Sequence, residues 1–192
     1  MELMELLKTR RTYRRFDQSR AISQEVLEDI MTAQRYASSA ANAQKLRYLV
    51  VQSPELVKQV FPLTRWAGML PPELGVPKEG ERPVLFVLVL YPAENPSQYI
   101  PTDAGLAISN MTLAAWGHGV GSCVLANIDR EGLRELLDID PAYTIHTAVA
   151  FGYPAHASRI VEPREGKLAY YLDENKDYCV PKLPLSETVR VV

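Results

Sequence analysis

The segment from Asp103 to Gly117, "DAGLAISNMTLAAWG", constrains the fold of this 192-residue chain more than any other stretch. Its residues are apolar on nearly every side of a helix, and Ala104, Ala107, Ala114 and Ala115 form a stripe of small side chains. A helix of this kind is buried and closely packed in a globular protein, so the other elements must be arranged around it. With 47% hydrophobic residues, the chain has enough apolar material for one core. We expect a single domain over residues 1–192.

The remaining elements follow from hydrophobic spacing and from helix-start signals. Apolar residues recur at helical spacing in two N-terminal segments, while Ser53-Pro54 and Asp129 are typical helix starts. Helices and strands mix without a strict alternation, which predicts an α+β fold rather than a doubly wound sheet. The predicted helices cover residues 2–9, 23–36, 54–61 and 129–137, and the predicted strands cover residues 47–51, 84–91 and 121–127. Residues 144–154 are predicted to form a strand followed by a turn.

Two segments show little regular pattern. Residues 62–82 hold four of the chain's 14 prolines and three of its ten glycines, which indicates an excursion or lid. From about residue 159 the chain has little periodicity and ends in "VPKLPLSETVRVV", which predicts an extended C-terminal arm. We expect both segments to pack on the domain rather than to form another one.

Charge and composition exclude several classes of protein. With 21 Lys and Arg against 23 Asp and Glu, the formal net charge is −2, so neither nucleic acid nor an anionic membrane surface is an expected partner. The longest apolar run, "VLFVLVLY", is far shorter than the roughly 20 residues that span a bilayer. Two cysteines and three histidines have no metal-ligand spacing, so no metal site is expected. The acidic N-terminus lacks a secretory pattern, and we expect a cytoplasmic protein.

A compact basic motif, "RRTYRRF", places Arg10, Arg11, Arg14 and Arg15 within six residues. In a chain with nearly balanced charge, this cluster indicates a local site for an anion. If the first helix continues, Arg14 lies one turn from Arg10 on the same face. The alternative is a solvated basic helix end that complements the helix dipole.

Three further motifs follow in order: "SSAANAQ" from Ser38 to Gln44, "DAGLAISNMTLAAWGHGVGSC", and "FGYP". Together with "RRTYRRF", their order and spacing resemble the nitroreductase family of flavin enzymes along nearly the whole chain. The resemblance implies a central, mostly antiparallel sheet flanked by helices, an intertwined homodimer, and flavin mononucleotide (FMN) bound at the subunit interface. It also implies NAD(P)H as co-substrate and a small electron-poor molecule, such as a nitroaromatic or a quinone, as acceptor in a ping-pong cycle.

The resemblance assigns residues to parts of the cofactor. Arg10, Arg11 and Thr12 correspond to phosphate and ribityl contacts, and Arg14 to a cation at the pyrimidine edge. In the C-terminal arm, Lys182 corresponds to a phosphate contact, with Arg159 as a possible substitute for an arginine that the family often has there. The loop that reaches the flavin of the other subunit corresponds to Ser38, Ser39, Ala40, Asn42 and Gln44. Backbone N–H groups near flavin N5 and O4 correspond to Leu125, Ala126 and Asn127.

The chain departs from the family pattern after Gln44, where Lys45-Leu46 replaces the usual Pro-Trp. By this resemblance, we expect the change to affect the local packing and the substrate pocket more than the flavin contacts. Three alternatives stay open: a simple polar loop at residues 38–44, a flavin-binding protein of this fold without fast reductase turnover, and a fold member with changed flavin chemistry. No acid–base pair stands out, which suits hydride transfer because that chemistry depends on positioning and electrostatics.

Overall fold

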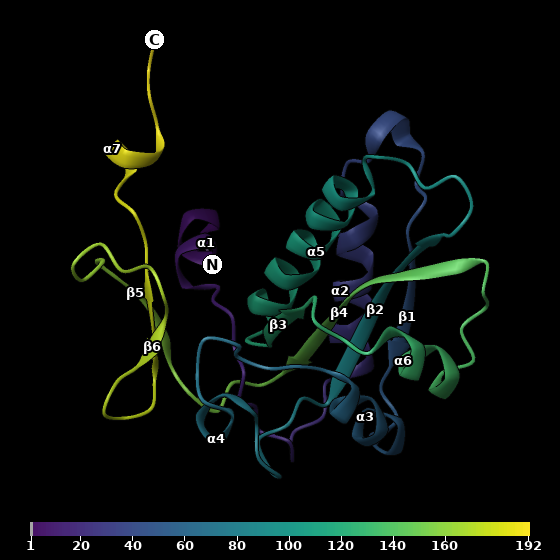
Figure 1. Cartoon of the computed structure of the whole chain (residues 1–192), viewed down its shortest axis with the longest axis horizontal. Coiled ribbons are helices and arrows are strands. Elements are labelled where there is room, and N and C mark those ends of the chain that lie inside the picture. The colour runs from purple at the N-terminus through teal and green to yellow at the C-terminus, as the bar shows by residue number, and fades with distance from the viewer. Residues whose placement is uncertain (1) are drawn as a thin grey trace.

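The computed structural model describes residues 2–192 as helices and strands arranged around one four-stranded sheet (Figure 1). Its elements are α1 (Leu3–Thr9), α2 (Gln24–Arg35), η1 (Ala40–Asn42), β1 (Arg47–Val51), α3 (Pro54–Val60), η2 (Phe61–Leu63), α4 (Pro72–Gly75), β2 (Leu85–Pro92), α5 (Ile100–Gly117), β3 (Gly121–Leu125), α6 (Arg130–Leu136), β4 (Tyr143–Gly152), β5 (Ser158–Val161), β6 (Tyr171–Leu172), β7 (Tyr178–Pro181) and α7 (Leu185–Thr188).

The central sheet has the strand order β1-β2-β4-β3, and every neighbouring pair is antiparallel. Strand β2 is buried on both faces because alternate side chains enter two separate cores. Phe86 and Leu88 pack with residues of α3 and α6, whereas Val87 and Val89 pack with residues of α2 and α5. These helical layers on both faces of an antiparallel sheet confirm the predicted α+β fold.

The predicted helix starts are confirmed at three serine or aspartate caps. Ser23 and Ser53 accept backbone N–H bonds at the starts of α2 and α3, and Asp129 accepts one from Gly132 at the start of α6. Pro54 occupies the first turn of α3, where its missing N–H has no cost. Between Pro62 and Arg82, the predicted excursion contains only the ends of η2 and the four-residue α4 as helical structure.

Helix α5 is longer than predicted and is buried along one side only. It begins at Ile100, because Pro101 fits its first turn, and Ala104, Ala107 and Met111 lie in the core. On the opposite side Leu106 is 43% exposed, so a single subunit buries only one face of this helix. None of the described helices is both long and apolar enough to cross a membrane.

The first helix does not continue through the basic motif, so the predicted helical relation between Arg10 and Arg14 is wrong. α1 ends at Thr9, and Arg10 has an extended backbone. Beyond it, Thr12 forms a bridge with Ser122 of β3, so the chain runs along the edge of the sheet. Gly121 permits this approach, since a Cβ atom there would lie 2.8 Å from the Tyr13 side chain.

The C-terminal segment, residues 155–192, is called the arm below and is more ordered than predicted. Strands β5, β7 and β6 form a second, three-stranded sheet, in which β5 and β7 are parallel. In Figure 1 the arm lies on the α1 side of the molecule, well clear of the four-stranded sheet. Its last residues, 182–192, are exposed, as an extended arm requires.

Candidate functional site

A pocket of about 430 Å³ collects much of the basic motif together with the arm. We call it the basic pocket. It is lined by Arg10, Arg11, Thr12, Arg14, Ile160, Tyr170, Val180 and Lys182. The extended backbone after α1 places the first four of these along one segment, and pairing of β7 with β5 brings the arm residues to the same place. The pocket therefore joins residues that are about 170 positions apart in the chain.

The basic pocket has an unbalanced positive charge. Among the described residues that line it there is no carboxylate. The Nε atoms of Arg10 and Arg11 are buried and have no hydrogen-bond partner. Burial, followed by the neighbouring charge of Arg10, lowers the pKa of Arg11 from its ordinary value. An oxyanion in the pocket would satisfy these donors and reduce the repulsion between the two guanidinium groups.

Arg14 reaches the basic pocket by a route other than the predicted helical turn. Its guanidinium carbon lies 4.3 Å from the centre of the Tyr170 ring and 4.9 Å from that of Tyr178. Two aromatic faces of the arm thus hold this cation at the pocket wall. The burial of Tyr178 supports this arrangement, since its side chain is 1% exposed.

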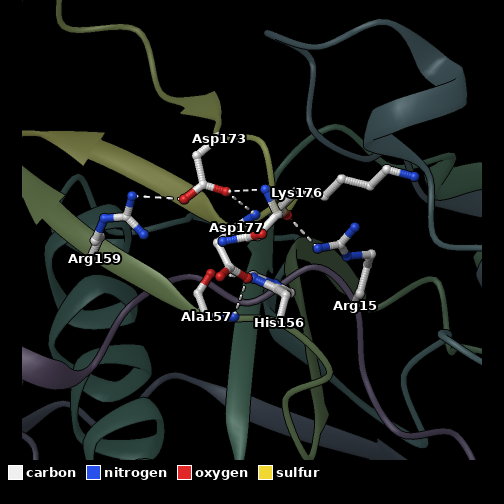
Figure 2. Close-up of polar contacts among 8 residues, drawn as sticks. Arg15, His156, Ala157, Arg159, Asp173, Lys176 and Asp177 are labelled. Atoms are coloured by element: carbon white, nitrogen blue, oxygen red, sulfur yellow. Dashed lines mark hydrogen bonds and ion pairs between the residues drawn. The ribbon is translucent and has the colours of Figure 1, made fainter.

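Two arginines near the pocket have other partners. Arg15 donates a hydrogen bond to the Lys176 carbonyl, as Figure 2 shows, and it does not line the basic pocket. Arg159 forms an ion pair of 2.7 Å with Asp173, also drawn in Figure 2. The suggested use of Arg159 as a substitute phosphate contact is therefore not supported by its position. Both residues instead stabilise the arm.

A second pocket of about 430 Å³ lies beside residues 38–44, which we call the serine loop. Ser38, Ser39 and Gln44 line it, whereas Ala40 and Asn42 do not. Ala41, Asn42 and Gln44 all have positive φ angles, of 51°, 51° and 47°. Left-handed backbone costs free energy in non-glycine residues, so the contacts of this loop must hold it in a strained conformation.

Asp103 of α5 holds the serine loop in place. Its Oδ1 atom accepts a hydrogen bond of 2.9 Å from the Ala40 backbone N–H, and the carboxylate is buried. The same carboxylate lies near Tyr48 of β1. Burial, with the Asp103 charge as the smaller cause, raises the pKa of Tyr48 to about 12.

The basic pocket and the serine loop lie near opposite ends of α5. Asp103 contacts the loop near the start of the helix, whereas Trp116 near its end donates a hydrogen bond of 2.8 Å to Thr9, next to Arg10. Thirteen residues of helix separate Asp103 from Trp116, a distance of about 20 Å. Within one subunit, the two groups of predicted residues do not form one site.

The third predicted segment, residues 125–127, begins with the last residue of strand β3 and continues into the loop after it. Leu125 has its side chain in the core, while Ala126 and Asn127 are exposed. The carbonyl groups of Ala126 and Asn127 accept hydrogen bonds from Arg130 and Arg65. None of the three residues lines the basic pocket or the pocket at the serine loop.

Sequence reasoning missed several residues of the site. Tyr170, Ile160 and Val180 line the basic pocket, but no local pattern distinguishes them from other arm residues. The sequence marks Asp103 as the start of a buried helix, and a carboxylate at the start of an apolar run is a signal for a buried hydrogen bond. Among the described residues, no group of His, Cys, Asp and Glu is arranged to hold a metal ion.

The residues present fit a phosphate monoester in the basic pocket. Such a group carries nearly two negative charges and accepts several hydrogen bonds. The pocket offers unpartnered guanidinium nitrogens, the ammonium of Lys182 and the hydroxyl of Thr12. This donor set is suited to bind an anion.

Comparison with known families gives one match that covers most of the chain. The model of the nitroreductase family matches residues 7–153, from the last turn of α1 to the end of β4. A protein of Archaeoglobus fulgidus, provisionally named NADH dehydrogenase/NAD(P)H nitroreductase, is 31% identical over 157 residues. That match covers 80% of this chain and 86% of the relative.

Solved structures show the same fold. An FMN-dependent nitroreductase from Clostridium difficile superposes with a TM-score of 0.68 at 20% identity, covering 82% of this chain and 90% of that one. A nitroreductase-type protein from Desulfovibrio desulfuricans, solved in complex with FMN, gives a TM-score of 0.68 at 22% identity. This second match covers 98% of the present chain and 95% of the other, so the likeness in fold includes the arm.

Proposed function

The chain belongs to the nitroreductase family, and we propose that it is a homodimeric, FMN-dependent oxidoreductase that uses NAD(P)H to reduce nitroaromatic, quinone or similar electron-poor acceptors. The observation that carries this proposal is the basic pocket, where Arg10 and Arg11 present buried, unpartnered nitrogens beside Lys182. The relatives' names support the reaction class, and the charge of the pocket supports a role in binding the phosphate of the cofactor.

In this proposal, Arg10, Arg11, Thr12 and Lys182 bind the FMN phosphate. Charge-assisted hydrogen bonds from a guanidinium to a phosphate are the strong class of such bonds. Arg14 supplies positive charge beside them and acts at the pyrimidine edge of the ring. The backbone N–H groups of residues 125–127 donate hydrogen bonds to flavin N5 and O4, where donors favour the reduced flavin.

The serine loop acts on the cofactor of the partner subunit. Within one subunit, the loop lies about 20 Å along α5 from its own basic pocket. A two-fold dimer can place the serine loop of one subunit beside the basic pocket of the other. Apolar side chains that one subunit leaves uncovered support a dimer, among them Leu3 and Met4 of α1, Leu106 of α5 and Leu185 of α7. Ser38, Ser39, Ala40, Asn42 and Gln44 would then contribute backbone and amide groups to the site.

The chemistry that FMN supplies when bound is acceptance of a hydride from NAD(P)H and, after exchange of ligands at the same site, delivery of electrons to the acceptor. This chain's residues bind the cofactor, orient it and set the charge around it. None of the residues assigned to the site needs to act as a dedicated general acid or base, because the protons can come from water.

The experiment is purification followed by cofactor analysis and turnover. We expect a yellow protein that releases FMN on denaturation and oxidises NAD(P)H when a quinone or nitroaromatic is added. Initial rates at several concentrations of both substrates should give the parallel reciprocal plots of a ping-pong mechanism. A flavin-loaded protein that fails to oxidise NAD(P)H would support a storage or sensing role instead.

A further inference from the structure

Backbone amides in the segment that carries the basic motif are bonded to distant parts of the chain. Most of their acceptors are carbonyl groups, which do not ionise between pH 4 and 8. The exception is the amide of Arg14, which donates a hydrogen bond of 3.0 Å to Nε2 of the His156 side chain. The carbonyl-bonded amides are Tyr13 to Ser122, Phe16 to Glu81 and Asp17 to Tyr153.

The partners of His156 define its protonation state. Nε2 accepts the Arg14 N–H, so it carries no proton. Nδ1 lies 2.8 Å from the Ala157 carbonyl oxygen, which can only accept, so Nδ1 carries the proton. The ring is therefore a neutral imidazole with a single tautomer that satisfies both neighbours.

The surroundings of His156 also favour the neutral ring. It lies between Tyr13 and Tyr178, with centroid distances of 5.3 Å and 4.7 Å. The charged groups that face it are Arg14, Arg15 and Asp177, and Figure 2 shows Arg15 and Asp177 near the ring. Asp177 already accepts the Ala157 N–H at 2.8 Å, and Arg15 is bonded to Lys176. Burial above all, with smaller contributions from both arginines, lowers the pKa of His156 to about 4.

Arg14 connects this histidine to the basic pocket. Its backbone is held by His156, at the base of the arm, and its guanidinium is held by Tyr170 and Tyr178, farther along the arm. The Tyr178 ring contacts both His156 and Arg14. Loss of the histidine contact would thus loosen a pocket cation and the arm together.

We propose that neutral His156 is a positioning residue that fixes Arg14 and the arm at the basic pocket, and that protonation of His156 opens this contact and releases the bound phosphate ligand. The identity of that ligand as FMN rests on the proposed function. A protonated ring has two donors and no acceptor, so it would face the Arg14 N–H with a proton and would add a positive charge beside Arg14 and Arg15.

The sign of the pH effect follows from the two pKa values. An exposed His156 in an opened arm takes up a proton near its ordinary pKa of 6.5, whereas the half-buried ring in the closed arm has a pKa lowered to about 4. Between these values, each unit of acidification favours the open arm by about tenfold. Above pH 6.5 neither form binds the proton, so the contact is insensitive to pH there.

The first test measures the release rate of FMN from the holoprotein between pH 7.5 and 5. His156→Gln is the key variant, because its amide oxygen can accept the Arg14 N–H but does not titrate. The phosphate's own ionisation near pH 6 affects both proteins alike. We expect similar rates at pH 7.5 and, at pH 5, release from the wild type at least about tenfold faster than from His156→Gln.

Two further variants define the contact. His156→Phe keeps an aromatic ring but has no acceptor, so release should be about fivefold faster at pH 7.5, the effect of one lost hydrogen bond. His146→Gln, a half-buried histidine of β4 outside both pockets, should leave the pH profile unchanged. Parallel pH profiles for the wild type and His156→Gln would overturn the proposal.

The second test uses the protein without flavin, so it is independent of the proposed function. Nitrogen chemical shifts of the His156 ring should report the Nδ1–H tautomer at neutral pH. Hydrogen exchange at the Arg14 amide, corrected for its intrinsic rate, should lose protection below pH 6.5 in the wild type but not in His156→Gln. If FMN does not bind but this exchange behaves as expected, the proposed cofactor is wrong and the histidine contact stands. If FMN binds but hydrogen exchange at the Arg14 amide has the same pH dependence in the wild type and in His156→Gln, the proposal is wrong and the proposed cofactor stands.

Discussion

The basic pocket and the serine loop lie near opposite ends of α5 and are stabilised in different ways. In the basic pocket, Arg14 is held by two aromatic faces of the arm, and Arg11 donates a hydrogen bond of 2.8 Å to the Leu7 carbonyl of α1. The serine loop is held by the buried carboxylate of Asp103 and contains left-handed residues at Ala41, Asn42 and Gln44. A single chain thus brings the cations of the basic pocket together, whereas the serine loop is a strained segment about 20 Å away along the same helix.

The largest effect should come from removing residues 183–192, which lie beyond Lys182. This deletion keeps the basic pocket but removes exposed apolar side chains such as Leu185, Val189 and Val191. Burying one such side chain in a dimer contributes about 1.5–3 kcal/mol, so we expect the dimer dissociation constant to rise at least about tenfold. Sedimentation measures it, with Glu187→Gln as a control that keeps the apolar residues. A truncated chain that dimerises as tightly as the full one would show that residues 183–192 do not contribute to the dimer interface.

The next effect tests the basic pocket alone. Arg10→Ala should weaken FMN binding by roughly ten- to a hundredfold, because a charge-assisted hydrogen bond contributes about 1.5–3 kcal/mol. Arg15→Ala removes the same charge from a side chain that is bonded to Lys176 outside the pocket. Flavin titration of the two apoproteins compares them, and equal losses would show that Arg10 has no special contact.

Mixed dimers would show whether the two regions meet across subunits. Asn42→Ala in the serine loop should weaken FMN binding severalfold, the loss expected for one neutral hydrogen bond. In a dimer of one Arg10→Ala subunit and one Asn42→Ala subunit, a site shared across the interface would have both groups intact at one position. We expect flavin titration of tagged mixed dimers to recover wild-type affinity at that position. If each subunit used its own loop, every site would keep a defect and no recovery would appear.

The smallest effect concerns the support of the serine loop. Asp103→Asn keeps an oxygen for the Ala40 N–H but removes the charge, so FMN affinity should fall only by a few fold. The same change should lower the pKa of Tyr48, though not to its ordinary value of 10.0, because burial is the larger cause of the shift to about 12. Tyrosinate absorbance titration, with Tyr48→Phe to identify the signal, measures this pKa. An unchanged titration would show that the carboxylate does not act on Tyr48.

The raised pKa of Tyr48 also predicts the pH dependence of folding stability. A hydroxyl that ionises at about 12 in the native state and at 10.0 when unfolded stabilises the fold below pH 10. That contribution is lost as the pH rises from 10 to about 12, so Tyr48→Phe should flatten alkaline unfolding curves in this range. Asp103→Asn should have a smaller effect of the same sign.

Local patterns in the sequence determined the main elements and the class of ligand. The caps at Ser23, Ser53 and Asp129, the apolar run of β2 and the long α5 all depend on neighbours within a few residues, and so spacing alone predicts them. The cluster of arginines from residue 10 to residue 15 likewise indicated an anion without reference to any other part of the chain. The order of four motifs identified the family.

Only the tertiary structure decided how those residues are used. The bridge of Thr12 to Ser122 makes the basic motif extended rather than helical, and the arm brings Tyr170, Tyr178 and Lys182 to it from far along the chain. His156 acquires its neutral tautomer from Arg14, 142 residues away. The separation of the serine loop from the basic pocket depends on which end of α5 each contacts. Periodicity and caps record local backbone preferences, whereas these contacts arise from long-range packing, which no local pattern encodes.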